Sequence, residues 1–90
     1  MKGYIYILEC ADGSFYTGAT NDLEHRLEQH QNGKGAKYIK GEGRLPVKLV
    51  YCEEFENVKD AFFSEKQIKR LSRKQKEELI SKNNQYANNH

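Results

Sequence analysis

The chain has 90 residues, of which 31 % are charged and 37 % hydrophobic, and a formal net charge of +2. These values predict one globular domain with a small core and exclude a disordered chain. There is no apolar run of about 18 residues and no signal peptide at the start, so we expect a cytoplasmic protein without a membrane partner. Cys10 and Cys52 lack the spacing of metal ligands, which favours free thiols over a disulfide or a metal site.

Charge alternates along the chain in four blocks. The net charge is −3 over residues 1–30, +4 over 31–50, −4 over 51–65 and +5 over 66–90. Two basic blocks that are separated by acidic ones suit a polyanionic partner such as nucleic acid. Solvated helix faces are the alternative interpretation of the same pattern.

The first two predicted elements are strands joined by a turn. Residues 3–10 are β-branched and aromatic and are apolar on both faces, which predicts a central strand that is covered on both sides. Residues 15–19 form the returning strand. A two-residue loop between them would point Tyr6 and Tyr16 to opposite faces, whereas a three-residue loop with a left-handed Gly13 would place both on one face. Propensity alone slightly favours the two-residue loop.

The next element is a helix predicted over residues 22–32, with Asn21 as its N-cap and Gly33 as its stop. Arg26 and His30 are four positions apart and therefore share one face of this helix. Together with the two tyrosines of the hairpin they form a polar cluster that hydrophobic packing does not require.

A basic loop follows the helix over residues 33–46 and carries one aromatic residue, Tyr38. Its candidate nucleic-acid contacts are Lys34, Lys37, Lys40 and Arg44. Such a loop can clamp a phosphate backbone, and a purely solubilising loop is an equal alternative. The third strand is predicted over residues 47–52.

A second helix is predicted from its cap Asn57 to Leu71, and its apolar stripe contains Glu65. A carboxylate on an apolar stripe destabilises the fold unless it is paired or binds a metal. A salt bridge with Lys69 is the structural alternative to a metal ligand.

The third helix is predicted to begin at a capping box formed by residues 72–75. Basic residues gather around this helix start and form a second candidate backbone contact, namely Lys69, Arg70, Arg73 and Lys74. The expected domain spans residues 1–82, and residues 83–90 are expected to be a disordered polar tail.

The ordered set Tyr4-Ile5-Tyr6, Tyr16-Thr17-Gly18 and Arg26 resembles the GIY-YIG nuclease superfamily. This superfamily includes phage homing endonucleases, the N-terminal cutting domain of the UvrC repair protein and some restriction enzymes. The similarity covers residues 3–80 and is greatest to small stand-alone bacterial members. It implies an α/β fold, in which a three-stranded antiparallel sheet is flanked by three helices in the order β-β-α-β-α-α. A shared site requires both tyrosines on one face, so we predict the three-residue hairpin loop.

The resemblance implies a metal-dependent endonuclease that cleaves phosphodiester bonds. Glu65 would be the protein ligand of a single Mg²⁺ or Mn²⁺, and Arg26 would hold the phosphate. Tyr16 occupies the position of the usual general base, and Tyr6 that of the tyrosine that supports the nucleophilic water. A phenol has an unperturbed pKa of about 10, and a neighbouring arginine and metal favour its ionised form. His30 occupies a position held by His or Tyr and would accept or relay a proton near pH 7.

The expected substrate is DNA in preference to RNA, in repair or nucleic-acid processing. Specificity would come from nucleic-acid structure or from a protein partner, and the oligomeric state is left open. A catalytically silent nucleic-acid-binding module and a protein-interaction adaptor are the rival interpretations. Departures from the family pattern leave the catalytic residues intact, and they are Tyr4, Thr17, Ala19 and Glu77.

Overall fold

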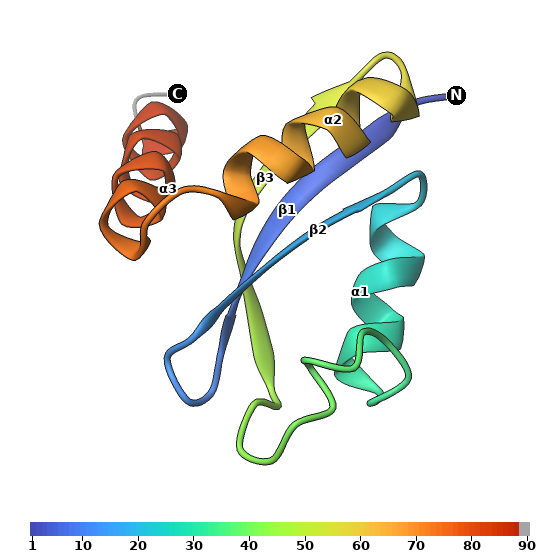
Figure 1. Ribbon diagram of the computed structural model, residues 1–90, viewed down its shortest axis with the longest axis vertical. Coiled ribbons are helices and arrows are strands. Elements are labelled where there is room, and N and C mark those ends of the chain that lie inside the picture. The colour runs from blue at the N-terminus through green and yellow to red at the C-terminus, as the bar shows by residue number, and fades with distance from the viewer. Residues whose placement is uncertain (89–90) are drawn as a thin grey trace.

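A computed structural model describes residues 1–88, and the side-chain surroundings of residues 1–82. The strands are β1 (Gly3–Cys10), β2 (Phe15–Thr20) and β3 (Val47–Phe55), and the helices are α1 (Leu23–Gln31), α2 (Val58–Lys69) and α3 (Arg73–Asn88). The element order is therefore β-β-α-β-α-α, as the resemblance implies (Figure 1).

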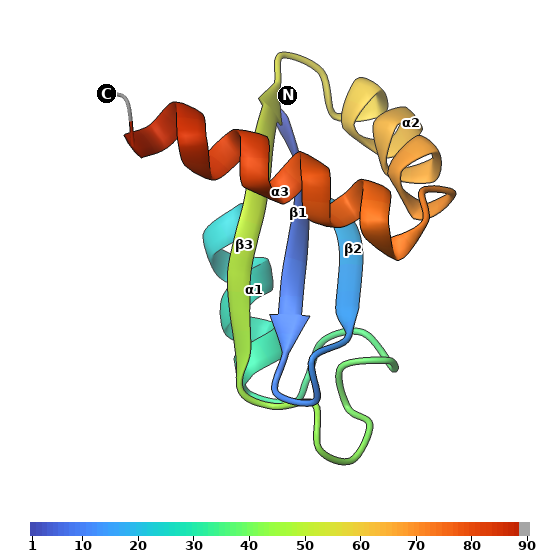
Figure 2. The ribbon, with the colours of Figure 1, turned by 90° about the vertical axis from the view of Figure 1, so that its left-hand side faces the viewer.

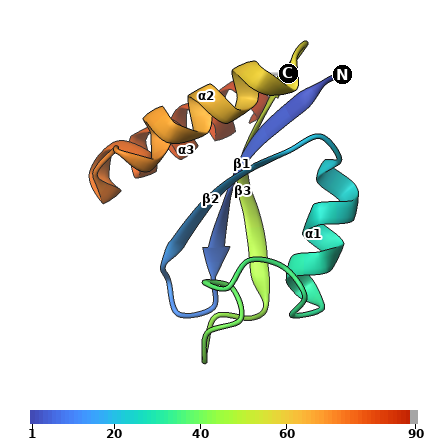
Figure 3. The same ribbon diagram turned by 45° about the vertical axis from the view of Figure 1, so that its right-hand side comes forward.

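The three strands form one antiparallel sheet in the order β2-β1-β3. Helix α1 covers one face of this sheet, and α2 and α3 cover the other (Figures 2 and 3). On the α2 side, Ile5 and Ile7 of β1 pack against Ala61 and Ile68. On the α1 side, Tyr6 and Leu8 pack against Leu23, Leu27 and Ile39. The prediction of a central strand covered on both faces is confirmed.

The hairpin between β1 and β2 has the three-residue loop. Tyr6 pairs with Gly18 and Leu8 pairs with Tyr16, which places the two tyrosine side chains on one face of the sheet. Gly13 has a φ of 86°, the left-handed conformation that a three-residue loop places at its last position. The prediction is confirmed, and the two-residue alternative is wrong.

Helix α1 begins one residue later than the sequence indicates. Its N-cap is Asp22, whose carboxylate accepts a hydrogen bond from the backbone N–H of His25 at 3.2 Å. Asn21 instead donates its side-chain amide to the sulfur of Met1 at 2.9 Å. The predicted cap at Asn21 is therefore wrong, because Asp22 and not Asn21 accepts the hydrogen bond from the first turn of the helix. Gly33, with a φ of 72°, follows the helix end as predicted.

The caps of the other two helices agree with the sequence. The Asn57 side chain accepts from the N–H of Lys59 at 2.8 Å at the start of α2. At the start of α3, the Ser72 hydroxyl accepts from the N–H of Gln75, and the Gln75 side chain accepts from the N–H of Ser72. These reciprocal bonds are the predicted capping box.

Strand β2 ends one residue later than predicted, at Thr20, and helix α2 ends at Lys69, so the predicted end at Leu71 is wrong. Two further elements are clearly longer than the sequence predicts. Strand β3 continues to Phe55, because Phe55 pairs with Gly3 at the far end of β1. Helix α3 continues through Asn88, so its backbone is helical beyond residue 82, and residues 89–90 lie outside the described part. The division into a domain and a tail stays a prediction. Within residues 1–88, no helix is both long and apolar enough to cross a membrane.

Candidate active site

Three aromatic side chains from three elements meet on the α1 side of the sheet. The ring centroids of Tyr6 and Tyr16 are 6.4 Å apart, and the His30 ring lies 5.8 Å from the first and 5.5 Å from the second. Gly18 makes room for this cluster, because a Cβ there would collide with the hydroxyl and ring of Tyr6. The structure thus brings together three of the five predicted catalytic residues.

His30 is held through both of its ring nitrogens. Its Nδ1 accepts the backbone N–H of Ala36 at 3.3 Å, and its Nε2 lies 2.8 Å from the hydroxyl of Tyr6. Since Nδ1 is an acceptor, a neutral imidazole carries its hydrogen on Nε2 and donates it to the Tyr6 oxygen. The O–H of Tyr6 then remains available to another acceptor.

Both members of this hydrogen-bonded pair are neutral at pH 7. Burial, with the nearby Arg26 charge adding, lowers the pKa of His30 to about 4. Burial raises the pKa of Tyr6 to about 12; Tyr16 adds to this shift, and Arg26 opposes it. His30 is 0 % exposed, so its imidazole has no contact with solvent. Its surroundings favour a neutral hydrogen-bond donor over the expected proton acceptor near pH 7.

The basic loop folds back onto the hairpin beside this cluster. The Tyr38 ring stacks on Tyr16 at a centroid distance of 6.0 Å, and the Arg44 guanidinium lies 3.7 Å above the Tyr38 ring. Arg44 also donates to the Tyr38 carbonyl at 2.9 Å and pairs with Asp12 at 3.5 Å. Sequence reasoning noted Tyr38 only as an aromatic residue in a loop, and the stacking adds it to the site.

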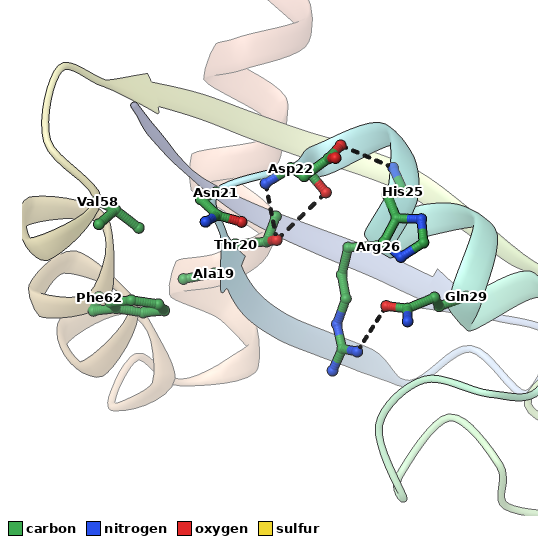
Figure 4. A pocket seen from close by; sticks show the side chains of 9 residues that line it. All are labelled: Ala19, Thr20, Asn21, Asp22, His25, Arg26, Gln29, Val58 and Phe62. Carbon is green, nitrogen blue, oxygen red and sulfur yellow. Dashed lines mark hydrogen bonds between the residues drawn. The ribbon is translucent and has the colours of Figure 1, made fainter. Parts of the chain in front are cut away.

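Arg26 lies on α1 beside an open pocket of about 430 Å³. Its guanidinium donates to the side-chain oxygen of Gln29 at 3.1 Å. Figure 4 shows these two side chains on the α1 wall of the pocket, with Val58 and Phe62 of α2 on the opposite wall and the end of β2 between them. Arg26 is thus placed where a bound phosphate could reach it from solvent.

Glu65 lies on α2 with 20 % of its side chain exposed, and it pairs with Lys69 at 3.5 Å. The salt bridge that the sequence offers as an alternative is therefore present. Besides burial and Tyr16, the Glu65 charge contributes to the raised pKa of Tyr6, so this carboxylate acts on the tyrosine cluster.

The donor set of this region fits a hard divalent cation with one protein ligand. Within residues 1–82, whose side-chain surroundings the structure describes, no three His, Cys, Asp or Glu side chains gather into a metal cage. A single carboxylate suits Mg²⁺ or Mn²⁺, which keep several waters and bind substrate phosphate. A cation at this carboxylate would compete with the Lys69 ammonium that pairs with Glu65.

Arg73, at the start of α3, contacts the hairpin. Its guanidinium lies 4.1 Å above the Phe15 ring and donates to the carbonyl of Gly13 at 2.8 Å. It also pairs with Glu77 at 3.4 Å. This side chain therefore joins α3 to the turn of the hairpin, sixty residues away in the sequence.

The eight predicted phosphate contacts divide into two groups. Three make structural contacts within the protein, namely Arg44, Lys69 and Arg73. The other five are exposed and form no ion pair within residues 1–82, namely Lys34, Lys37, Lys40, Arg70 and Lys74. The second group supplies the cations that remain available to a ligand.

Comparison with known proteins gives consistent results. A model of the GIY-YIG catalytic domain matches residues 2–78. The UPF0213 protein CPE1444 of Clostridium perfringens is 58 % identical over 78 residues, which are 87 % of this chain and 82 % of that protein. A UPF0213 protein of Streptococcus pneumoniae is 50 % identical over 82 residues, 91 % of this chain and 81 % of that protein.

Solved structures agree with these matches. The solution NMR structure of the UPF0213 protein BH0048 from Bacillus halodurans has a TM-score of 0.59 at 48 % identity, and the match covers 90 % of this chain and 84 % of that one. The solution structure of EF2693 from E. faecalis has a TM-score of 0.61 at 42 % identity, over 91 % of this chain and 85 % of that one. Since the family model spans both strands of the hairpin and all of α1 and α2, this chain belongs to the GIY-YIG family.

Proposed function

We propose that this protein is a metal-dependent endonuclease that hydrolyses phosphodiester bonds in DNA. The observation that carries the proposal is the meeting of Tyr6, Tyr16 and His30 on one sheet face, close enough to Arg26 for its charge to shift two of their pKa values. A packed core does not need this arrangement, whereas phosphodiester hydrolysis needs a base and a cation near the phosphate.

Exposure distinguishes the roles of the two tyrosines. Tyr6 is 1 % exposed and its pKa is about 12, so it stays protonated and has little contact with solvent. Tyr16 is only partly buried, so its side chain, unlike that of Tyr6, has contact with solvent. We therefore assign Tyr16 as the general base and Tyr6 as the residue that positions it. His30 fixes Tyr6 by donating from Nε2.

The reaction proceeds as an attack of water on phosphorus. The Tyr16 phenolate takes a proton from the water as the new P–O bond forms and the bond to the leaving oxygen breaks. Arg26 holds the phosphate through its fork of N–H donors. Glu65 would hold a divalent cation, which supplies neutralisation of the charge on the leaving oxygen when bound.

A catalytically silent nucleic-acid-binding module is the second candidate function. The ion pair between Glu65 and Lys69 favours it, because that pair occupies the only carboxylate assigned to the metal. The exposed lysines of the loop would then bind phosphates without cleavage, and affinity would fall steeply with salt. Both candidates predict binding of nucleic acid, but only the first predicts cleavage products.

The test is a cleavage assay with labelled duplex, flap, nicked and single-stranded DNA, and with RNA, in Mg²⁺, Mn²⁺ or EDTA. We expect cleavage of at least one DNA structure that stops in EDTA and in the variant Arg26→Ala. Salt-dependent binding without cleavage of any substrate would favour the silent module. Cleavage that persists in EDTA would contradict the assigned metal requirement.

A further inference from the structure

An aromatic side chain is exposed at the pocket between α1 and α2, and local packing does not account for it. Phe62 is 45 % exposed and lines this pocket. Its neighbour Phe63 is 67 % exposed and does not line the pocket. Ala61 and Ile68 are the buried apolar residues of α2, and Phe62 does not belong to the cluster that they form with the sheet, so the core does not need an aromatic ring at position 62.

The wall opposite Phe62 offers hydrogen-bond donors. Arg26 and Gln29 face the ring across the pocket, and the guanidinium of Arg26 has further N–H donors besides the one that Gln29 accepts (Figure 4). The one acidic residue that lines the pocket, Asp22, accepts the helix-capping bond of His25. One wall therefore suits the face of a ring, and the other suits an anion.

The pocket is also next to the assigned chemistry. Glu65 follows Phe62 by three positions on α2, which places it on the same side of the helix one turn further along. Arg26 belongs both to the pocket and to the proposed phosphate site. A ligand that fills the pocket therefore contacts Arg26 and lies against the side of α2 that carries Glu65.

We infer that this pocket binds an unpaired nucleotide of the nucleic-acid substrate, with its base stacked on Phe62 and its phosphate held by Arg26. The inference rests on the proposed function and narrows its substrate class to nucleic acid with a single-stranded segment at the cut. The bases of a duplex stack on one another and do not present a free face, whereas aromatic side chains bind single strands by stacking. The volume of about 430 Å³ lies in the range of small-ligand pockets.

The test measures binding of a short single-stranded oligonucleotide that contains 2-aminopurine, in EDTA so that cleavage plays no part. Stacking on an aromatic ring quenches this base, and loss of one such contact weakens binding by roughly 5- to 150-fold. We expect Phe62→Ala to weaken single-strand binding within that range and to relieve the quenching. Phe63→Ala, on the same helix but outside the pocket, should bind within about twofold of the parent protein.

A second variant separates stacking from shape. Phe62→Leu keeps an apolar side chain of similar size but removes the aromatic face, so it should lose as much affinity as Phe62→Ala. Parent-like binding by Phe62→Leu, or an equal loss for fully paired duplex, would overturn the subsite. Stacking at Phe62 in a protein that cleaves nothing would support the subsite while contradicting the proposed nuclease activity.

Discussion

The two faces of the sheet hold different chemistry, although β1 contributes side chains to both. On the α2 side, Ile5 and Ile7 contact aliphatic residues of two helices. On the α1 side, Tyr6 carries a buried hydroxyl that pairs with a buried histidine. The first face stabilises the fold by burial of apolar surface, and the second holds polar groups that a stable core does not need. Substitutions on the first face should mainly change stability, and those on the second mainly activity.

A substitution of Glu65 tests this contrast most strongly. The residue lies on α2, whose side of the sheet is expected to affect stability, and yet it is assigned to the reaction. Glu65→Gln should abolish detectable cleavage, since an amide is a far weaker ligand for a divalent cation. The free energy of unfolding without metal should change by at most about 1 kcal/mol, because the Lys69 partner is half-exposed and solvent screens the pair. Stabilisation by Mg²⁺, which needs a native-state ligand, should be weak in the parent protein and absent in the variant.

Lys69→Gln is the matched control for this prediction. It removes the same ion pair but keeps the carboxylate, so cleavage should persist. Thermal melts with and without Mg²⁺, beside a cleavage assay, measure both variants. A Glu65→Gln protein that still cuts, or a Lys69→Gln protein that does not, would show that the ion pair and not the metal explains this residue.

Gly18→Ala should reduce both the cleavage activity and the stability of the protein. The added Cβ collides with the Tyr6 hydroxyl and ring, so Tyr6 must move and its bond to His30 must break. We expect a loss of cleavage of about 100-fold and a destabilisation of about 1–3 kcal/mol. Denaturant melts can check the cause, because the destabilisation should be smaller in a Tyr6→Leu background, which lacks both the colliding ring and the colliding oxygen. Equal destabilisation in both backgrounds would contradict it.

Stability should also depend on the protonation of His30. Its pKa is about 4 in the folded protein and 6.5 when unperturbed, so the unfolded chain binds more protons between these values. The free energy of unfolding should therefore fall as pH decreases from 6.5 to 4, by at most about 3 kcal/mol. Tyr6, Tyr16 and Arg26 face this ring, and the Arg26 charge opposes its protonation.

Urea melts across this pH range measure the effect by comparison of variants. His30→Gln should lose most of the pH dependence, even if it is less stable throughout. His25→Gln, which changes an exposed histidine on the same helix, should retain the parent profile. Parallel profiles for the parent protein and His30→Gln would contradict a buried neutral His30.

The smallest predicted effect lies on the aliphatic face. The Thr17 hydroxyl is buried and makes no hydrogen bond to any residue from 1 to 82. Thr17→Val replaces it with a methyl group of similar size, so stability should rise by about 1 kcal/mol. This corresponds to a gain in Tm of about 4–8 °C. Cleavage should be unchanged, because Thr17 pairs with Ile7 on the face opposite to the tyrosines.

The sequence predicted those features of the site that depend on local rules. The capping box at Ser72 and the cap at Asn57 follow local patterns. The parity of the hairpin, which places Tyr6 and Tyr16 together, does not: local propensity slightly favours the wrong loop, and the requirement for a shared face, which the resemblance implies, selected the right one. The choice between Asn21 and Asp22 failed because both are good caps and propensity does not separate neighbours.

The features that the sequence could not predict depend on how the basic loop of residues 33–46 packs against α1 and the hairpin. The burial of His30 requires the N–H of Ala36 to reach its ring, which helical periodicity cannot indicate. The stacking of Tyr38 on Tyr16 has the same origin. Arg73 was interpreted as a phosphate contact because a charge pattern does not reveal a partner in the distant hairpin turn.

The central claim is that the α1 side of the sheet performs general-base chemistry through Tyr16. The most direct measurement compares cleavage by Tyr16→Phe with cleavage by Tyr38→Phe, its stacked neighbour. Both variants lose one hydroxyl and keep the ring, so both should retain Tm. We predict that Tyr16→Phe cleaves roughly 100-fold more slowly or worse, whereas Tyr38→Phe cleaves like the parent protein. Cleavage by Tyr16→Phe within a few-fold of the parent rate would contradict the account.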